Sequence, residues 1–335
     1  MSNPRNITEQ YEACQEVGGF CRREDHGLIE LTGADRADWL NHFVTNVITP
    51  LRPGEGNYVF APTLKGRVVF DANVLILEDR IWLDIDRRLI EKATDHLNRY
   101  IITEDVRLAD ISERSHRLAV LGPTAHALVQ DLGFGNLVPM AWLQHSTISR
   151  DNVSILMMRH DFAGLPGAEF MLTGRVISET AAAITQAAER LNLCPVDRET
   201  INILRIEAGI PASVEDIDED VLPPETGQRE RGISHQKGCY LGQEVIERMR
   251  SHDVLPRTLV CVRFDGDAPV PPRSRLEIDG QEVGHTRSGC FSEAVRSPVS
   301  LAYVKTPCAA PGTTLIARLD EGPRAGTVVN PPLHR

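Results

Sequence analysis

Short apolar runs that end at a glycine recur along the first half of the chain. Each run has the pattern of apolar residues that is typical of a strand. After its glycine, apolar side chains recur at a spacing that places them on one face of a helix. In the first copy we predict the helix over residues 35–47. The three copies cover residues 27–47, 117–130 and 169–188, with Gly33, Gly122 and Gly174 at their turns.

Further strands and one more helix are predicted between these units. The helix covers residues 88–100, and the strands cover residues 58–61, 68–77, 81–85 and 106–111. The order indicates α+β lobes built on mixed or antiparallel sheets. Because no regular βαβ alternation carries the motif G-x-G-x-x-G, a nicotinamide enzyme is disfavoured.

The second half changes character after a helix that starts near Asp197 and stops at Gly209 and Pro211. The acidic run 215–220 then reads as a solvated connector, since its spacing does not match a calcium loop. Another short helix is predicted over residues 243–250.

Short strands separated by Gly, Pro and Asp follow Pro256, which is typical of a small antiparallel barrel or sandwich. They cover residues 257–264, 275–278, 282–286, 301–304 and 314–318. We therefore divide the chain into a two-lobed body, 1–250, and a C-terminal β-barrel, 251–335, and expect an irregular tail after Glu321.

The composition is that of an ordinary globular protein, with 335 residues, 41% hydrophobic and 25% charged. A net charge of −11 argues against a general nucleic-acid surface, because neutralising phosphates needs clustered Lys and Arg. Local positive charge around residues 229–257 would suit a small anionic ligand, although a solvated face with compensating glutamates explains it equally well.

Seven scattered cysteines without a C-x-x-C pair indicate neither a disulfide framework nor a zinc site, and they fit a reducing compartment. The histidines show no paired metal-ligand spacing, so no metal is expected. The polar start of the chain lacks a signal peptide, and no apolar run approaches the roughly 18 residues of a spanning helix. We expect a cytoplasmic protein without a membrane partner.

The candidate chemistry lies in residues 234–248, where Cys239 stands between Gly238 and Gly242 before the predicted helix. The glycines leave room for a ligand near the main chain, and a helix start with Lys237 nearby favours a thiolate. The alternative is a small buried cysteine beside ordinary turn glycines.

Residues 237–244, KGCYLGQE, resemble the K-G-C-[FY]-x-G-Q-E signature of the YgfZ family. These are folate-binding relatives of the glycine-cleavage T-protein that support iron–sulfur cluster assembly or repair, and so indirectly tRNA modification by iron–sulfur enzymes. The resemblance implies a T-protein-like folate-binding body with a C-terminal barrel, and iron–sulfur clients or assembly proteins as partners. It also implies tetrahydrofolate, or a one-carbon derivative of it, as the cofactor.

On that resemblance we assign Cys239, Lys237 and Asp71 to the chemistry, and Glu207, Arg205, Gly238, Gly242 and Gln243 to cofactor binding. Residues 204–211, LRIEAGIP, are similar to the family's L-R-x-E-A-G-x-P segment, whose glutamate contacts the pterin ring in T-proteins. A carboxylate accepts the pterin's adjacent 2-amino and N3–H donors as a pair. Glu207 is therefore the expected folate anchor; a surface glutamate paired with a cation is the alternative.

Residues 64–74 resemble the superfamily segment in which two adjacent aspartates follow a glycine pair. Here only one acid remains, Asp71 after Phe70, and Arg67 replaces the second glycine. This departure disfavours aminomethyltransferase chemistry. Asp71 could still contact a folate, and the equally weighted alternative is a polar residue at a strand end that binds no ligand. Three hypotheses remain: a folate-dependent iron–sulfur factor, a folate-dependent aminomethyltransferase or demethylase, and a non-catalytic folate-binding module with a structural Cys239.

Overall fold

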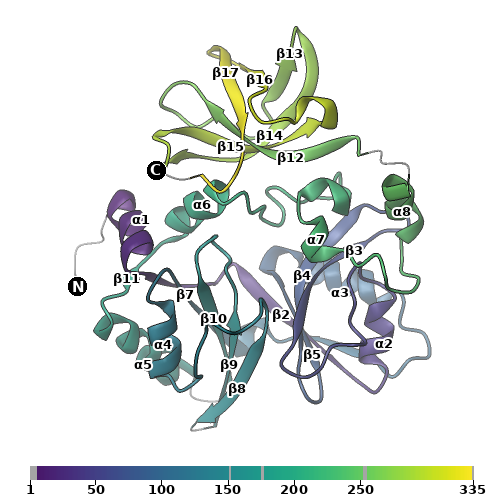
Figure 1. Cartoon of the computed structure of the whole chain (residues 1–335). Coiled ribbons are helices and arrows are strands. Elements are labelled where there is room, and N and C mark those ends of the chain that lie inside the picture. Colours follow the sequence, from purple (N-terminus) through teal and green to yellow (C-terminus); the bar gives the residue numbers. More distant parts are fainter. Residues whose placement is uncertain (1–5, 151, 175–176, 252–254, 334–335) are drawn as a thin grey trace.

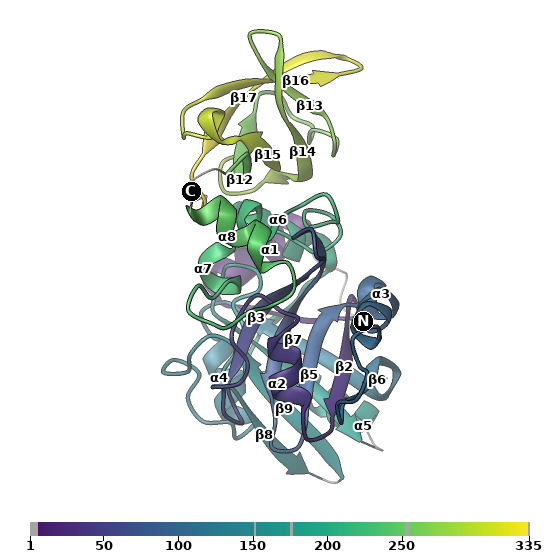
Figure 2. The ribbon, with the colours of Figure 1, turned by 90° about the vertical axis from the view of Figure 1, so that its right-hand side faces the viewer.

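The computed structural model describes residues 6–150, 152–174, 177–251 and 255–333. Two sheet-based lobes lie side by side, and a β-barrel stands over them with a layer of short helices in between (Figures 1 and 2). Within the described residues no helix is long and apolar enough to cross a bilayer.

The first lobe is a five-stranded sheet in the order β3-β4-β5-β2-β6. All its pairings are antiparallel, and residues 68–76 of β4 are buried on both faces. Its strands are β2 (His26–Thr32), β3 (Gly56–Pro62), β4 (Val68–Ile76), β5 (Ile81–Asp86) and β6 (Arg107–Asp110), and its helices are α2 (Arg36–Asn41) and α3 (Ile90–Asn98). The helices pack with this sheet around Leu40, Leu83 and Leu97.

The second lobe is a six-stranded sheet in the order β11-β1-β7-β10-β9-β8, antiparallel except for the pair β1 and β11. Its strands are β1 (Gly19–Arg22), β7 (Ser115–Leu121), β8 (His145–Arg150), β9 (Val153–Arg159), β10 (Gly167–Gly174) and β11 (Cys194–Pro195), with helices α4 (Ala125–Asp131) and α5 (Ile177–Arg190). An apolar cluster that includes Leu28, Leu75, Leu156 and Met158 joins the two sheets.

The predicted repeats of strand, glycine and helix are present in both lobes. Gly33 and Gly122 have φ of 107° and 101°, in the left-handed region that favours glycine. A Cβ on Gly33 would lie 1.9 Å from the carbonyl oxygen of Asp105, so the turn also needs the missing side chain. The repeat therefore reflects two related turns at equivalent places in the lobes.

The layer above the lobes holds α1 (Ile7–Glu16), α6 (Arg198–Glu207), α7 (Arg229–Gly232) and α8 (Gln243–Ser251). Asn6 and Asp197 cap α1 and α6 through their side chains, which accept from the backbone N–H groups of Glu9 and Thr200. The apolar face of α6 packs with α1 and with the barrel residues Cys261, Cys290 and Leu301. Helix α6 therefore joins the body to the barrel.

The barrel is a closed six-stranded antiparallel structure in the order β12-β15-β14-β13-β16-β17. Its strands are β12 (Arg257–Phe264), β13 (Arg275–Ile278), β14 (Gln281–Ser292), β15 (Ser297–Lys305), β16 (Thr314–Leu319) and β17 (Gly322–Val329). The expected α+β body with a C-terminal antiparallel barrel is confirmed. Closure removes the exposed edges that an open sheet of this size would carry.

Three local expectations were wrong. The helix predicted over residues 35–47 ends at Asn41, whose side-chain oxygen accepts from the backbone N–H of Ile48 and holds the following turns. The tail after Glu321 is not irregular, because β17 completes the barrel between β12 and β16. The acidic run is not merely a solvated connector, since Asp216 is fully buried and bonded to Arg205.

Candidate functional site

A cavity of about 860 Å³ lies where the two lobes, the layer of short helices and the barrel meet. Its wall includes Tyr58 and Asp71 from the first lobe, His160 from the second, Arg205 from α6 and Arg287 from the barrel. Known small-molecule sites have about 300–1,000 Å³ and often form between domains, so this cavity has the size and position of a ligand site.

Asp71 is the buried carboxylate of the first-lobe wall. The Tyr58 hydroxyl donates to its Oδ2 at 2.8 Å, and the Ser213 hydroxyl donates to its Oδ1 at 2.7 Å. Burial raises the pKa of the Asp71 carboxyl, although these two hydrogen bonds work in the opposite direction. Each oxygen keeps a second lone pair, so Asp71 can still accept two hydrogen bonds from a ligand.

Trp142 and Arg231 form a second part of the wall. The Arg231 guanidinium carbon lies 4.1 Å from the centroid of the Trp142 ring, a cation–π contact. The Trp142 indole N–H is buried without a hydrogen-bond partner, and no ion pair joins Arg231 to a carboxylate among the described residues. This side of the cavity therefore offers a cation to an anionic ligand.

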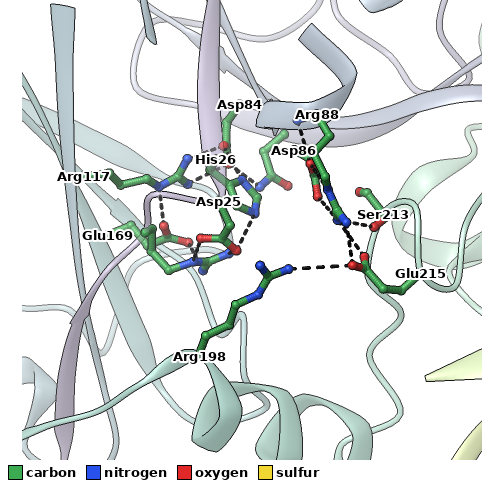
Figure 3. Close-up of polar contacts among 12 residues, drawn as sticks. Asp25, His26, Asp84, Asp86, Arg88, Arg117, Glu169, Arg198, Ser213 and Glu215 are labelled. Atoms are coloured by element: carbon green, nitrogen blue, oxygen red, sulfur yellow. Dashed lines mark hydrogen bonds and ion pairs between the residues drawn. The ribbon is translucent and has the colours of Figure 1, made fainter. Parts of the chain in front are cut away.

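A buried ion network joins the two sheets beneath the cavity (Figure 3). Arg117 on β7 donates to Asp84 of β5 and to Glu169 of β10, and both carboxylates have no exposed surface in their side chains. Burial raises the pKa of each carboxyl, but Arg117 and the neighbouring cations outweigh it and hold both well below their usual range. The network supplies fixed charges that support the cavity floor.

A second polar group stands opposite that network (Figure 3). Arg88 binds Asp86 and Glu215 through its guanidinium, and Glu215 also faces Arg198 at 3.7 Å. The acidic run thus supplies a counter-charge to the cavity wall. Within the described residues no group of three or more His, Cys, Asp or Glu side chains is arranged to hold a metal ion.

Arg205 and Glu207 lie two residues apart on α6 and therefore on opposite faces of that helix. Arg205 lines the cavity, where it donates to Asp216 at 2.8 Å and to the hydroxyl of Ser288 on β14 at 2.8 Å. Its guanidinium links the helix, the acidic loop and the barrel.

Glu207 is not part of the cavity wall. The Tyr11 hydroxyl donates to its Oε2 at 2.7 Å, while the Ser292 hydroxyl and the Ala294 backbone N–H donate to its Oε1 at 2.5 and 3.0 Å. These contacts fasten α6 to α1 and the barrel. The folate anchor predicted at Glu207 thus points away from the cavity, and we do not include it in the binding site proposed below.

The predicted thiol stretch lies outside the cavity wall, before α8. Cys239 is the exposed cysteine of the seven, whereas burial raises the thiol pKa of Cys14, Cys21 and Cys261 to about 12. Helix α8 begins at Gln243, so Cys239 precedes the helix by four residues. Accessibility, rather than a helix start, distinguishes this thiol.

The Lys237 ammonium points to the turns after α2. It donates to the carbonyl oxygens of Asn41, Val44 and Asn46 at 2.7, 2.6 and 2.7 Å. Three acceptors match the three N–H bonds of an ammonium group. Lys237 thereby fixes the segment that carries Cys239.

Gly238, Gly242 and Gln243 also lie outside the cavity wall. Gly242 has φ of 76°, and a Cβ there would lie 2.4 Å from the Thr63 carbonyl oxygen, so the close neighbour is a backbone loop. A Cβ on Gly238 would meet nothing within 4 Å, and the Gln243 side chain accepts from the Tyr240 backbone N–H. Their predicted part in cofactor binding stays a prediction.

The sequence did not single out several cavity residues, among them Tyr58, Trp142, His160 and Arg287, whereas Arg231 belongs to the predicted local positive charge. One signal was available for the supporting network, because Arg117 and Glu169 are charged residues inside apolar strand runs. A buried charge of this kind requires a partner.

Comparison with known proteins gives consistent matches. Residues 3–230 match the GCVT N-terminal domain, and residues 257–334 match the glycine cleavage T-protein C-terminal barrel domain. The crystal structure of glycine cleavage system aminomethyltransferase T from Bartonella henselae superposes with a TM-score of 0.87 at 18% identity, over 99% of this chain and 91% of that one. That likeness shows the fold.

Two curated relatives are similar over most of the chain. A putative transferase, chloroplastic, from Arabidopsis thaliana is 26% identical over 86% of this chain and 66% of its own length. An aminomethyltransferase from Staphylococcus carnosus is 24% identical over 89% of this chain and 82% of its own length. Together with the two domain matches, this shows that the chain belongs to the glycine-cleavage T-protein family, with the GCVT N-terminal domain followed by the C-terminal barrel domain.

Proposed function

We propose that the central cavity binds tetrahydrofolate or a one-carbon derivative of it, with Asp71 as the pterin anchor. The observation that carries this proposal is a buried carboxylate with two unused acceptor positions on the wall of an 860 Å³ cavity. A pterin presents two adjacent N–H donors, which a carboxylate accepts as a pair. The family's tetrahydrofolate chemistry supports the same ligand.

Other parts of the cavity wall suit the rest of a folate. The flat Trp142 ring and the partly free Arg231 would face an aromatic or anionic part of the ligand. Arg198 and Arg273, which line the cavity and keep largely exposed side chains, would serve carboxylates of the tail. The fit therefore uses side chains of the body and of the barrel.

We further propose that the folate-bound protein acts in iron–sulfur cluster assembly or repair in the cytoplasm, through the Cys239 thiol. Support comes from the KGCYLGQE stretch, from the exposure of Cys239, and from Lys237, which holds that stretch in place. An accessible thiol can form a mixed disulfide or ligate iron transiently. Client or assembly proteins would approach the face that carries α8.

The alternative is a folate-dependent aminomethyltransferase, favoured by the names of the bacterial relatives. Phe70 stands where that chemistry would have a second adjacent acid, and its side chain is buried in the apolar core of the first lobe. Transfer of a methylene group from an aminomethylated lipoyl carrier protein to tetrahydrofolate tests this alternative. Turnover in that assay would replace the iron–sulfur proposal.

Calorimetric titration with tetrahydrofolate under anaerobic conditions tests the binding proposal. Asp71→Asn should weaken binding about tenfold to a hundredfold, because a hydrogen bond to a charged group contributes roughly 1.5–3 kcal/mol. Since burial raises the pKa of Asp71, wild-type affinity should fall on acidification at a higher pH than an ordinary carboxyl would require. The carboxylate form is the acceptor, so affinity is retained above that pKa and lost below it.

The matched control is Asp79→Asn, which removes the same charge from an exposed turn of the same lobe. This variant should bind tetrahydrofolate as the wild type does. Absence of wild-type binding would refute the proposal, and equal affinity of the Asp71 and Asp79 variants would remove Asp71 as the anchor.

A further inference from the structure

His160, after β9 of the second lobe, and His26, at the start of β2 of the first lobe, both line the cavity, and each is held by a buried carboxylate. His160 Nδ1 lies 2.5 Å from Oε1 of Glu169, and His26 Nδ1 lies 2.8 Å from Oδ1 of Asp84. A carboxylate only accepts, so in both rings Nδ1 carries the hydrogen and donates it. Each neutral ring then has its lone pair on Nε2.

The two histidines differ at Nε2. For His26 that nitrogen already faces the Asp25 carboxylate at 4.0 Å. Within the described residues His160 Nε2 has no hydrogen-bond partner, and it is not one of the buried atoms that lack a partner. Nε2 is therefore accessible. Among the two, His160 offers the cavity a lone pair.

The carboxylate behind His160 is fixed. Glu169 has no exposed surface and also accepts from Arg117 and from Arg23 at 3.4 Å. Two arginines compensate its charge, so Glu169 can orient the ring and stabilise a protonated imidazole without being protonated itself.

Aromatic rings flank His160 on both sides. The centroids of Trp142 and Phe162 each lie 5.8 Å from the imidazole centroid. The charged groups that face His160 from the surrounding elements are Glu169, Arg23, Arg117, Asp161 and Arg231. The contacts fix the ring, and His160 lines the cavity.

We propose that His160 is the proton acceptor of the cavity, acting on an N–H or O–H group of the bound ligand; for a folate this rests on the function proposed above. Nε2 accepts the hydrogen bond and, when the ligand releases its proton, binds that proton, while the electron pair stays on the ligand. Nδ1–H remains bonded to Glu169, which keeps the ring in place as the proton arrives. The sequence motifs do not single out His160 for this role.

The ligand-free protein gives the first test. Diethyl pyrocarbonate acylates accessible, unprotonated imidazole nitrogens, and peptide mass spectrometry reports the rate at each histidine. His160 should react, whereas buried His145, whose two nitrogens both contact carbonyl oxygens, should not. An unreactive His160 would overturn the proposal whether or not a folate binds.

Tetrahydrofolate then tests the contact. Saturating ligand should slow the acylation of His160 at least tenfold and leave that of His235 unchanged. His235 is the control outside the cavity wall: it also pairs Nδ1 with a carboxylate, Glu247, at 2.8 Å, and its Nε2 accepts from Arg229 at 3.3 Å. If calorimetry shows binding while His160 stays unprotected, the inference fails and the proposed function stands; if nothing binds, the proposed function fails.

His160→Gln separates proton acceptance from structural support. A glutamine amide can still donate to Glu169, so the melting temperature should stay that of the wild type. Calorimetry in buffers of different ionisation enthalpy counts the protons released on binding, and the wild type should release fewer than His160→Gln because Nε2 keeps the proton that the ligand gives up. Equal proton counts would contradict the proposal, and His235→Gln should match the wild type.

Discussion

The floor of the cavity and the thiol segment, residues 234–242, are held in opposite ways. The floor rests on Arg117, Asp84 and Glu169, which are buried and joined to one another across two sheets. The thiol segment exposes Cys239 and is held to the turns after α2 by Lys237, on three carbonyl groups, and by the backbone N–H groups of Ser234 and Leu241. The first region is held by buried charges, and the second presents an exposed thiol on a surface segment.

The largest effect is expected from breaking the floor. Arg117→Met leaves two buried carboxylates without their shared cation and should lower the free energy of unfolding by about 3–5 kcal/mol. Urea denaturation at pH 7 measures this, with exposed Arg114→Met as the control, which should change little.

The pH dependence of that loss follows from the carboxyl pKa values. In the wild type the pKa values of both carboxyls are depressed. Their contribution to the free energy of unfolding is therefore present above the unfolded-state pKa of about 4, and it is lost as pH falls through the folded-state pKa values. In Arg117→Met the same burial would raise both values, and acidification toward pH 4 should recover part of the loss. A deficit that does not change with pH would contradict this.

A smaller effect is expected from Lys237→Met. The variant leaves three carbonyl oxygens at the turns after α2 without their donor and should cost about 2 kcal/mol of stability. Thermal unfolding measures the loss, and exposed Lys65→Met is the control. Because the cavity wall is separate, tetrahydrofolate affinity should persist at temperatures where Lys237→Met is folded; a wild-type melting temperature would argue against the anchoring role.

The smallest effect on stability is expected from Cys239→Ala, less than about 0.5 kcal/mol, because the side chain is exposed. The same variant should fail to restore the activity of iron–sulfur enzymes in a deletion strain. Half-buried Cys308→Ala is the thiol control and should restore it. Full rescue by Cys239→Ala would mean that the thiol has no part in the function.

The fold was largely predictable because its signals are local. Gly33 and Gly122 mark turns that require positive φ, and the barrel strands alternate between short turns. Asp71 could be placed on a buried strand for the same reason. The division of the chain near residues 251–256 stays a prediction, and the barrel strands begin at Arg257.

The candidate site was predictable only in part because its contacts are not local. Helical spacing alone puts Arg205 and Glu207 on opposite faces, yet which face meets the cavity depends on how the barrel sits on α6. The target of Lys237 is a set of turns almost 200 residues earlier, as its bonds to Asn41 and Val44 show. No sequence spacing reveals such pairs.

A structure of the protein with tetrahydrofolate tests the central claim most directly. We predict the pterin in the cavity with its adjacent N–H donors on the Asp71 carboxylate, its surroundings including Trp142 and His160, and Cys239 outside that contact shell. A folate bound at the thiol segment, or one in the cavity that leaves Asp71 bonded only to Tyr58 and Ser213, would contradict it.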